Sequence, residues 1–303
     1  MLDINSPVYK DENAARKHLE SIRWADGRYC PHCGESEHTA FVRGKKHRPG
    51  LYYCNACKKQ FTVTVGTIFE RSKVPLNKWV LAFHLMCSSK KGISAHQLHR
   101  TLGVTYKTAW FMAHRIRETM KDENPGALGG GGKVVESDET YFKGGTTTTI
   151  KTLPDGSAVP VVAPRYYKVM ALVERGGKSR AFHIDAINVK NAHAVLRDSH
   201  LMTDEAGHYR ILGKRYLTHQ RVVHSRKEYV RGKVHTNTIE GYFSIFKRGM
   251  KGVYQHCAEK HLQRYINELD FRYNTRDLDD FTRAATAIKQ AEGRRLTYQQ
   301  PSR

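Results

Sequence analysis

The 303-residue chain has no long run of apolar residues. Its best run, WVLAFHLMC at 79–87, carries a histidine and is far shorter than the roughly 20 apolar residues that a membrane-spanning helix needs. The N-terminal sequence MLDINSPVYKDENAARK also lacks the apolar segment of an export signal. We therefore expect a cytoplasmic protein with no membrane partner.

Acidic residues are scarce as well. The chain has 29 Asp and Glu against 51 Lys and Arg, which gives a net charge of +22 and a pI of about 9.8. Such an excess indicates a polyanionic partner, with nucleic acid as the first candidate and an anionic membrane surface as the second. The charge is concentrated in residues 30–121, which carry 16 Lys and Arg against four Glu. A solvated basic face is the simpler alternative, but this density favours contact with nucleic acid.

Cysteine is also rare, and four of the six cysteines form two close pairs, CPHC at 30–33 and CNAC at 54–57. In a chain without an export signal, paired CxxC units indicate a metal site rather than disulfides. Two such pairs predict one tetrahedral zinc held by Cys30, Cys33, Cys54 and Cys57. A closed four-sulfur shell is structural and not catalytic. A rubredoxin-like iron site uses similar pairs, but the basic surroundings favour a zinc ribbon. Cys87, inside an apolar helix, is expected to be a core thiol.

The pattern of the chain predicts a multidomain α+β protein. We expect an N-terminal helix (1–20), a zinc ribbon (21–69), a helical DNA-binding domain (70–121), a flexible glycine-rich linker (122–133), an α/β domain (134–285) and a basic tail (286–303). The linker is predicted from DENPGALGGGGK, which has five glycines and a proline.

The helical segment has the pattern of a helix-turn-helix. Pro75 begins a first helix, Ser94 caps a short second helix, Gly103 lies in the turn, and Thr105 caps a third helix that reaches about Met120. A plain three-helix packing unit is the alternative. The polar residues off the apolar stripe of the third helix are Tyr106, Lys107, Thr108, His114, Arg115 and Arg117. Of these, Tyr106, Lys107, Thr108 and Arg115 are the predicted DNA contacts.

Three acidic residues stand at positions where carboxylates can converge. Asp138 lies in the strand VVESDETYF, Asp204 follows the short strand HLMT, and Glu240 lies at the start of a helix. Three carboxylates from a central strand, a neighbouring strand end and a later helix can hold two Mg²⁺ about 4 Å apart. Glu136 shares a strand face with Asp138, so either could be the ligand, and Asn237 lies one helical turn before Glu240. Each acid could also be an ordinary cap or turn residue.

From about residue 21 to residue 274, the chain resembles the bacterial insertion-sequence transposases related to the Merlin transposons. The motifs that carry the resemblance are CPHCG, YYCNACKKQFTVTVGTIFE, VVESDETYFKGG, LMTDEAGHY, HTNTIEGYFSIFKRGMKGVYQH and HLQRYINELDFRYN. The resemblance implies a zinc ribbon, a helix-turn-helix and a ribonuclease-H-like catalytic domain. It assigns the family's three metal-binding carboxylates to Asp138, Asp204 and Glu240, with Mg²⁺ or Mn²⁺ as the catalytic ions.

This resemblance implies an enzyme that binds the terminal inverted repeats of its element, hydrolyses a phosphodiester at each end and joins the 3′-hydroxyls to target DNA. Lys247, Arg248 and Lys251 are expected to hold backbone phosphates near the cut. Because two DNA ends must be held together, at least a homodimer is expected, associated with the bacterial nucleoid. The alternatives are a nuclease of the same fold that does not join strands, and a non-catalytic DNA-binding regulator.

Overall fold

The computed structural model describes residues 5–44, 46–184, 196–197, 199–205 and 217–297. These residues form two compact units, one of residues 1–121 with 275–303 and one of residues 122–274. The mixed α/β class expected from the sequence is confirmed. The expected boundary at residue 285 differs from this division, because the chain from 275 onward packs with the first unit. In the described part of the chain, no helix has both the length and the hydropathy to cross a membrane.

The first unit begins with a short 3₁₀ turn, η1 (Pro7–Tyr9), and the amphipathic helix α1 (Glu12–Arg23). The Asp11 side chain accepts a hydrogen bond from the Ala14 amide and so caps α1. Strands β1 (Thr39–Phe41), β2 (Tyr52–Cys54) and β3 (Gln60–Phe61) then form a three-stranded antiparallel sheet. Trp24 lies edge-on to the stacked rings of Tyr52 and Phe61, so α1 and this sheet share an aromatic core.

Three helices follow in the first unit: α2 (Leu76–Ser88), α3 (Ala95–Leu102) and α4 (Tyr106–Thr119). The caps are those that the sequence indicates. Ser94 Oγ accepts from the Gln97 amide, and the Thr105 side chain accepts from the Thr108 amide. Gly103 has φ +58°, the left-handed conformation that ends α3 at little steric cost. The helices enclose a core that includes Trp79, Phe83, Leu98, Met112 and Ile116.

The C-terminal segment completes the first unit and is not a detached basic tail. Helix α9 (Asp280–Lys289) contacts α1, α2 and α4. Beyond it, the Ile68 amide donates to the Ala291 carbonyl and the Gly293 amide donates to the Gly66 carbonyl. Ala291 and Leu296 are buried. The prediction of a tail over 286–303 is therefore wrong for its described residues, since apolar side chains alternate with the basic ones and are buried.

The second unit is built on a five-stranded sheet with the order β10-β9-β5-β6-β7. Strands β5 (Val134–Thr152), β6 (Ala158–Glu174) and β7 (Ser179–Ile184) form an antiparallel meander. Strands β9 (His200–Thr203) and β10 (Thr218–Arg221) extend the sheet parallel to β5. Strand β5, which contains Asp138, is therefore the central strand.

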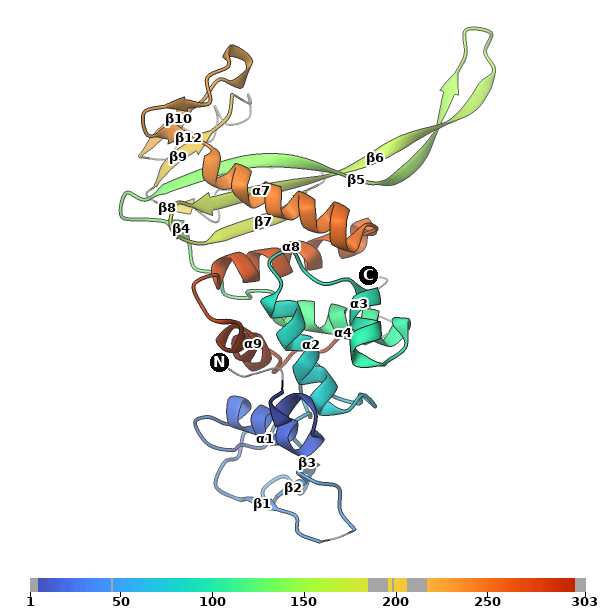
Figure 1. Cartoon of the computed structure of the whole chain (residues 1–303), viewed down its shortest axis with the longest axis vertical. Helices are drawn as coiled ribbons and strands as arrows, with labels where there is room; N and C mark the ends of the chain where they lie inside the picture. Colours follow the sequence, from blue (N-terminus) through green and yellow to red (C-terminus); the bar gives the residue numbers. More distant parts are fainter. Residues whose placement is uncertain (1–4, 45, 185–195, 198, 206–216, 298–303) are drawn as a thin grey trace. The chain divides into compact units, whose positions relative to one another are not determined.

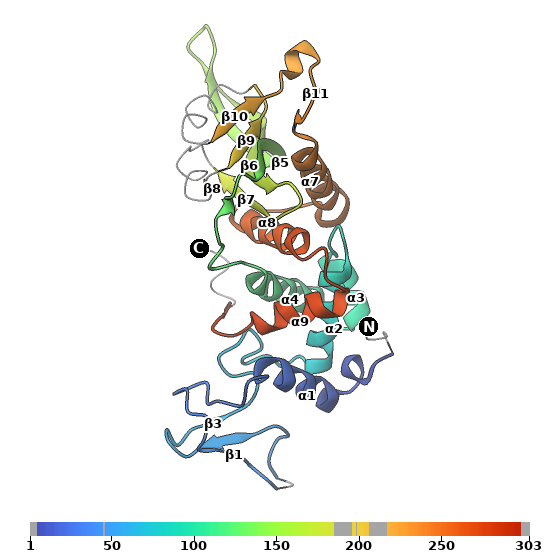
Figure 2. The same ribbon diagram turned by 90° about the vertical axis from the view of Figure 1, so that its left-hand side faces the viewer.

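Two helices cover one face of this sheet (Figure 2). Helix α7 (Asn237–Gly249) continues into a wider π-type turn, η4 (Met250–Tyr254), and helix α8 (Glu259–Asn274) follows. Their buried residues pack against Phe142, Tyr167, Val169 and Ala181 of the sheet. This packing places the first turn of α7 over β5.

The remaining elements of the second unit are short. Strand β4 (Leu128–Gly129) pairs with β8 (Leu196–Arg197), β11 (Val230–Arg231) pairs with β12 (Val234–His235), and η3 spans His224–Arg226. The sequence pattern predicts a helix near 189–198. Most of these residues lie outside the described part of the chain, and residues 196–197 form strand β8.

Two features of the second unit differ from the sequence-based expectation. Strands β5 and β6 continue past the sheet as a long two-stranded arm, which Figure 1 shows in green, because Thr, Val and Ile residues keep the β pattern beyond VVESDETYF. The segment expected to be a flexible linker includes strand β4. There Leu128 is only 2% exposed, and the Gly129 amide donates to the Glu174 carboxylate.

Candidate active site and metal centre

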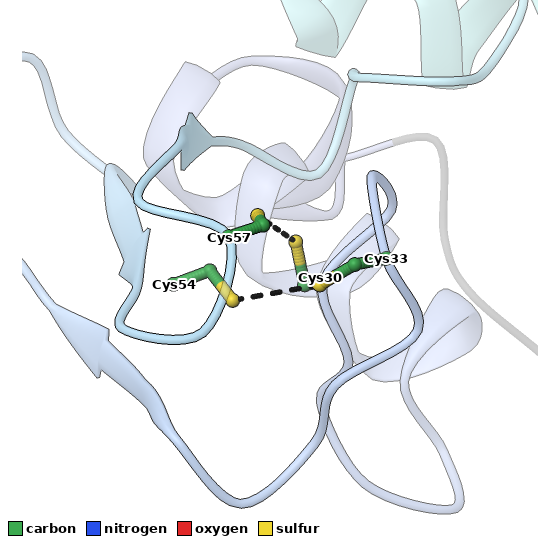
Figure 3. A group of neighbouring side chains, drawn as sticks. All are labelled: Cys30, Cys33, Cys54 and Cys57. Carbon is green, nitrogen blue, oxygen red and sulfur yellow. Dashed lines mark hydrogen bonds between the residues drawn. The ribbon is translucent and has the colours of Figure 1, made fainter.

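The four paired cysteines come together in the first unit (Figure 3). Their sulfur atoms all lie within 4.8 Å of one another, and the Cys30–Cys57 and Cys33–Cys54 Sγ–Sγ distances are both 3.7 Å. A tetrahedral zinc with Zn–S bonds of about 2.3 Å requires sulfurs about 3.8 Å apart. The cluster therefore fits a structural zinc, as the spacing predicted.

Backbone amides favour the thiolate form of Cys54, which is the form that binds zinc. The Cys57 and Ala56 amides donate to the Cys54 sulfur and lower the pKa of that thiol to about 7. Four sulfurs this close cannot all be anionic without a cation between them. Cys87 is buried in α2, as expected, and Cys257 is buried in the core of the second unit.

The second unit holds a cleft of about 750 Å³. Its lining contains both carboxylates and basic side chains. The lining residues are Asp138, Glu139, Glu240, Phe243, Ser244, Lys247, Arg248, Lys251 and Gly252. The cleft thus brings together two of the three predicted catalytic acids and all three predicted phosphate contacts.

The three predicted acids lie on neighbouring elements of the second unit. Asp138 is in the central strand β5, and Asp204 directly follows the parallel neighbour β9. Glu240 lies in the first turn of α7 and accepts a hydrogen bond from Thr236 Oγ1 at 3.0 Å. The oxygens of the three carboxylates do not all lie within 4.8 Å of one another, unlike the cysteine sulfurs.

Asp138 has the most perturbed acidity in the cleft. Burial and, to a lesser extent, the nearby charges of Asp204, Glu139 and Glu240 together raise the pKa of its carboxyl to about 7, against a hydrogen bond from the Glu139 amide that lowers it. The Asp138 carboxylate is therefore destabilised, and either protonation or a bound cation would remove this unfavourable energy. Carboxylate oxygens are the ligands that Mg²⁺ and Mn²⁺ prefer, so the donor set fits such a cation.

The structure separates the two acids that share a face of β5. Glu136 is 0% exposed, and its carboxylate accepts hydrogen bonds from Arg175 Nε at 2.6 Å, from Thr238 Oγ1 at 3.0 Å and from the Ile239 amide at 2.9 Å. Neither Glu136 nor Asn237 is among the residues that line the cleft.

The predicted DNA contacts on α4 differ in how far their side chains are exposed. Tyr106 is 44% exposed and stacks on the ring of His96, with centroids 4.3 Å apart. Lys107 is exposed and Thr108 is half-buried. The prediction for Arg115 is wrong. It is only 8% exposed, and its guanidinium donates to the carbonyls of Leu296 and Glu70.

The burial of α4 extends beyond Arg115. His114 and Arg117, also placed off the apolar stripe by the sequence pattern, are buried as well. For Arg115 the cause is the C-terminal segment, whose Leu296 carbonyl lies about 180 residues along the chain and leaves no local trace in the sequence of α4.

Sequence reasoning missed four residues of the cleft: Glu139, Phe243, Ser244 and Gly252. A signal for two of them was present. Phe243 and Ser244 follow Glu240 by three and four residues, so they share its face of α7, as Lys247 does seven residues on. Glu139 is adjacent to Asp138 in the chain and also lines the cleft, although successive side chains of a strand point to opposite faces.

Comparison with known proteins gives matches in both units. The family described as "Transposase zinc-ribbon domain" matches residues 10–60, and the family described as "ISXO2-like transposase domain" matches residues 128–274. A protein of Halobacterium salinarum described as an uncharacterized protein in the transposable element ISH50 is 28% identical over 279 residues. That alignment covers 88% of this chain and 92% of the relative.

Proposed function

Because the chain belongs to the insertion-sequence transposases, with their zinc-ribbon and ISXO2-like domains, we propose that it binds the terminal inverted repeats of its element, hydrolyses a phosphodiester at each end and transfers the 3′-hydroxyls to target DNA. The observation that carries this proposal is the position of Asp138. It lies on the central strand, where the charges of Asp204 and Glu240 raise the pKa of its carboxyl. Basic side chains of α7 line the same cleft.

The catalytic domain is ribonuclease-H-like. In support of this, a central strand flanked by an antiparallel meander and by parallel strands places one acid on β5, a second after β9 and a third on the helix above.

Asp138, Asp204 and Glu240 would hold two Mg²⁺ or Mn²⁺. When bound, such cations neutralise charge on the attacking and leaving oxygens of a phosphodiester and lower the pKa of a water or a 3′-hydroxyl. Lys247, Arg248 and Lys251 line the same cleft, and they hold the phosphates on either side of the scissile bond.

The first unit binds DNA through a helix-turn-helix formed by α2, α3 and α4. No Asp or Glu occurs between residues 71 and 117, so these helices themselves contribute no acidic side chain that would repel phosphate. Tyr106, Lys107 and Thr108, at the N-terminal end of α4, contact the groove. The enzyme acts as at least a dimer, because two element ends are processed together.

The test is cleavage of a labelled duplex that carries the element end, in Mg²⁺, with end binding measured in parallel. Asp138→Asn, Asp204→Asn and Glu240→Gln should each lower cleavage by at least about 10²-fold and leave binding unchanged, and double variants should cost little more than single ones. As a helix-terminal acid alone, Glu240 would contribute only about 0.3–1 kcal/mol to folding, so Glu240→Gln should still fold.

Matched variants distinguish the alternatives. Normal cleavage by Glu240→Gln together with loss of cleavage in Asn237→Ala would move the third ligand to Asn237. Cleaved but never joined products would identify a nuclease. A wild-type chain that binds ends and cuts nothing in Mg²⁺ or Mn²⁺ would indicate a DNA-binding regulator.

A further inference from the structure

A buried carboxylate outside the cleft joins the central strand to the helix that carries Glu240. Glu136 Oε2 accepts from the Ile239 amide in the first turn of α7, and Glu136 Oε1 accepts from Thr238 Oγ1. The N-terminus of a helix carries partial positive charge and unpaired amide donors, so a carboxylate there both caps the helix and complements its dipole. Thr236, the residue before α7, makes no side-chain cap to the helix amides, so the cap comes from β5.

Arg175 holds the Glu136 carboxylate in this position. Its Nε donates to Glu136 at 2.6 Å, its Nη1 donates to the Lys233 carbonyl at 2.8 Å, and its Nη2 donates to the His235 carbonyl at 2.8 Å. The Arg175 amide also donates to the Val134 carbonyl of β5. A guanidinium bonded at three nitrogens has little freedom to move, and charge-assisted bonds are the strong ones in a buried network. The network therefore joins β5, the β11–β12 hairpin and the start of α7.

The two ends of this network lie next to the catalytic acids. Asp138 is two residues beyond Glu136 in the same strand, a separation of about 7 Å along the chain. Glu240 immediately follows Ile239, whose amide Glu136 binds. Any shift of the first turn of α7 relative to β5 therefore changes the distance between the Asp138 and Glu240 carboxylates.

We propose that Glu136 is a positioning residue that, held by Arg175, sets the separation of Asp138 and Glu240 and thereby the affinity of the cleft for its divalent cations. This rests on the proposed function, in which Asp138 and Glu240 are the metal ligands. Groups that orient metal ligands without touching the metal change metal affinity by roughly 10–100-fold when they are replaced.

The first variant to make is Glu136→Gln, which keeps the shape of the side chain. Its amide can accept at only one oxygen, so an NH₂ group meets either Arg175 or the Ile239 amide, both of which are donors. We expect Mn²⁺ binding, measured by the electron paramagnetic resonance of free Mn²⁺, to weaken by about 10-fold or more. The Mg²⁺ concentration for half-maximal cleavage should rise by a similar factor, while KM for the element-end duplex stays unchanged.

The matched control is Glu174→Gln. Glu174 is also buried and neighbours Arg175, but its carboxylate accepts from the Gly129 amide and from Lys133 Nζ, and neither of these donors belongs to α7. Both variants should lower the melting temperature, and only Glu136→Gln should change Mn²⁺ binding. Equal Mn²⁺ affinity in the two variants, matching the wild type, would overturn the proposal and leave Glu136 as a structural acid.

A second variant keeps the test informative if Glu136→Gln fails to fold. Thr238→Val removes one hydrogen bond to Glu136 and keeps the side-chain volume. It should weaken Mn²⁺ binding in the same direction but by a smaller factor than Glu136→Gln, because the hydrogen bonds from Arg175 and from the Ile239 amide to Glu136 remain. Unchanged Mn²⁺ affinity in Thr238→Val would also contradict the proposal. If Asp138→Asn binds Mn²⁺ normally, then the proposed function itself fails, whatever Glu136→Gln does.

Discussion

Asp270 of α8 is an acid outside the cleft, and its environment makes the stability of the second unit depend on pH. Its carboxylate accepts from Ser179 Oγ, from the Tyr242 hydroxyl and from the Ala181 amide, at 2.7 to 2.8 Å. These bonds join α8 to β7 and to α7. Burial nevertheless outweighs them and raises the pKa of Asp270 to about 6.

This shift predicts a pH-dependent free energy of unfolding. Because the folded-state pKa lies above the ordinary value of 3.8, the folded protein holds its proton more tightly between these two values. The contribution of Asp270 is therefore fully present below pH 4 and is lost as the pH rises through about 6. In urea unfolding, the stability difference between wild type and Asp270→Asn should shrink over this range. A difference that stays constant from pH 4 to pH 8 would contradict this.

Also at the residue scale, Glu136 and Asp138 lie two residues apart in β5 but have different surroundings. Glu136 is enclosed by Arg175 and by the start of α7, whereas Asp138 borders the cleft. Burial of a carboxylate with full hydrogen bonding suits a structural role, while a partly unsatisfied acid among other acids suits cation binding.

At the scale of the element, the strands of the zinc ribbon have only two or three residues each. We therefore expect a bound zinc to supply much of the folding free energy of the ribbon. A Cys54→Ser protein should lose its zinc and the amide hydrogen-exchange protection of residues 30–61, while Mn²⁺ binding in the second unit stays unchanged.

The control for this prediction is Cys87→Ala, which removes a buried thiol of α2 and leaves the cluster intact. It should keep one zinc per chain in metal analysis. If Cys54→Ser also retains one zinc per chain, then the four-cysteine assignment is wrong.

At the scale of the whole molecule, the first unit is assembled from two distant parts of the chain. The C-terminal part buries Ala284, Ala287, Ile288, Ala291 and Leu296. A chain that ends after Asn274 should therefore lose the cooperative unfolding of the first unit and its end binding, since the burial of Ile288 and of Leu296 alone contributes about 1.5–3 kcal/mol each. The second unit should remain folded, which calorimetry would show as a retained thermal transition and a Mn²⁺ titration as retained Mn²⁺ binding.

The matched control is the double variant Lys289→Ala and Arg295→Ala, which removes exposed positive charge from the same segment without changing its packing. It should keep both thermal transitions. If this variant loses the first unit as completely as the truncated chain does, then charge and not packing is the contribution of residues 275–297.

The sequence alone determined the features that depend on neighbours within a few residues. Each CxxC pair places two sulfurs close together because its cysteines are three residues apart, and the two pairs predicted the four-cysteine cluster. Ser94, Gly103 and Thr105 predicted the ends of α3 and α4, because helix caps form between residues that are a few positions apart. The alternation of strands and helices likewise placed the three acids on β5, after β9 and on α7.

Only the tertiary structure decided which of these side chains remain accessible. Arg115 is covered through Leu296, about 180 residues later, and Glu136 is enclosed by Arg175 and Ile239, about 40 and 100 residues later. The tertiary structure also decided the burial of the C-terminal segment. Its basic composition predicted an exposed tail, but its apolar side chains are buried in the first unit. Burial of a charged side chain depends on what packs over it, and such distant contacts leave no periodicity in the local sequence.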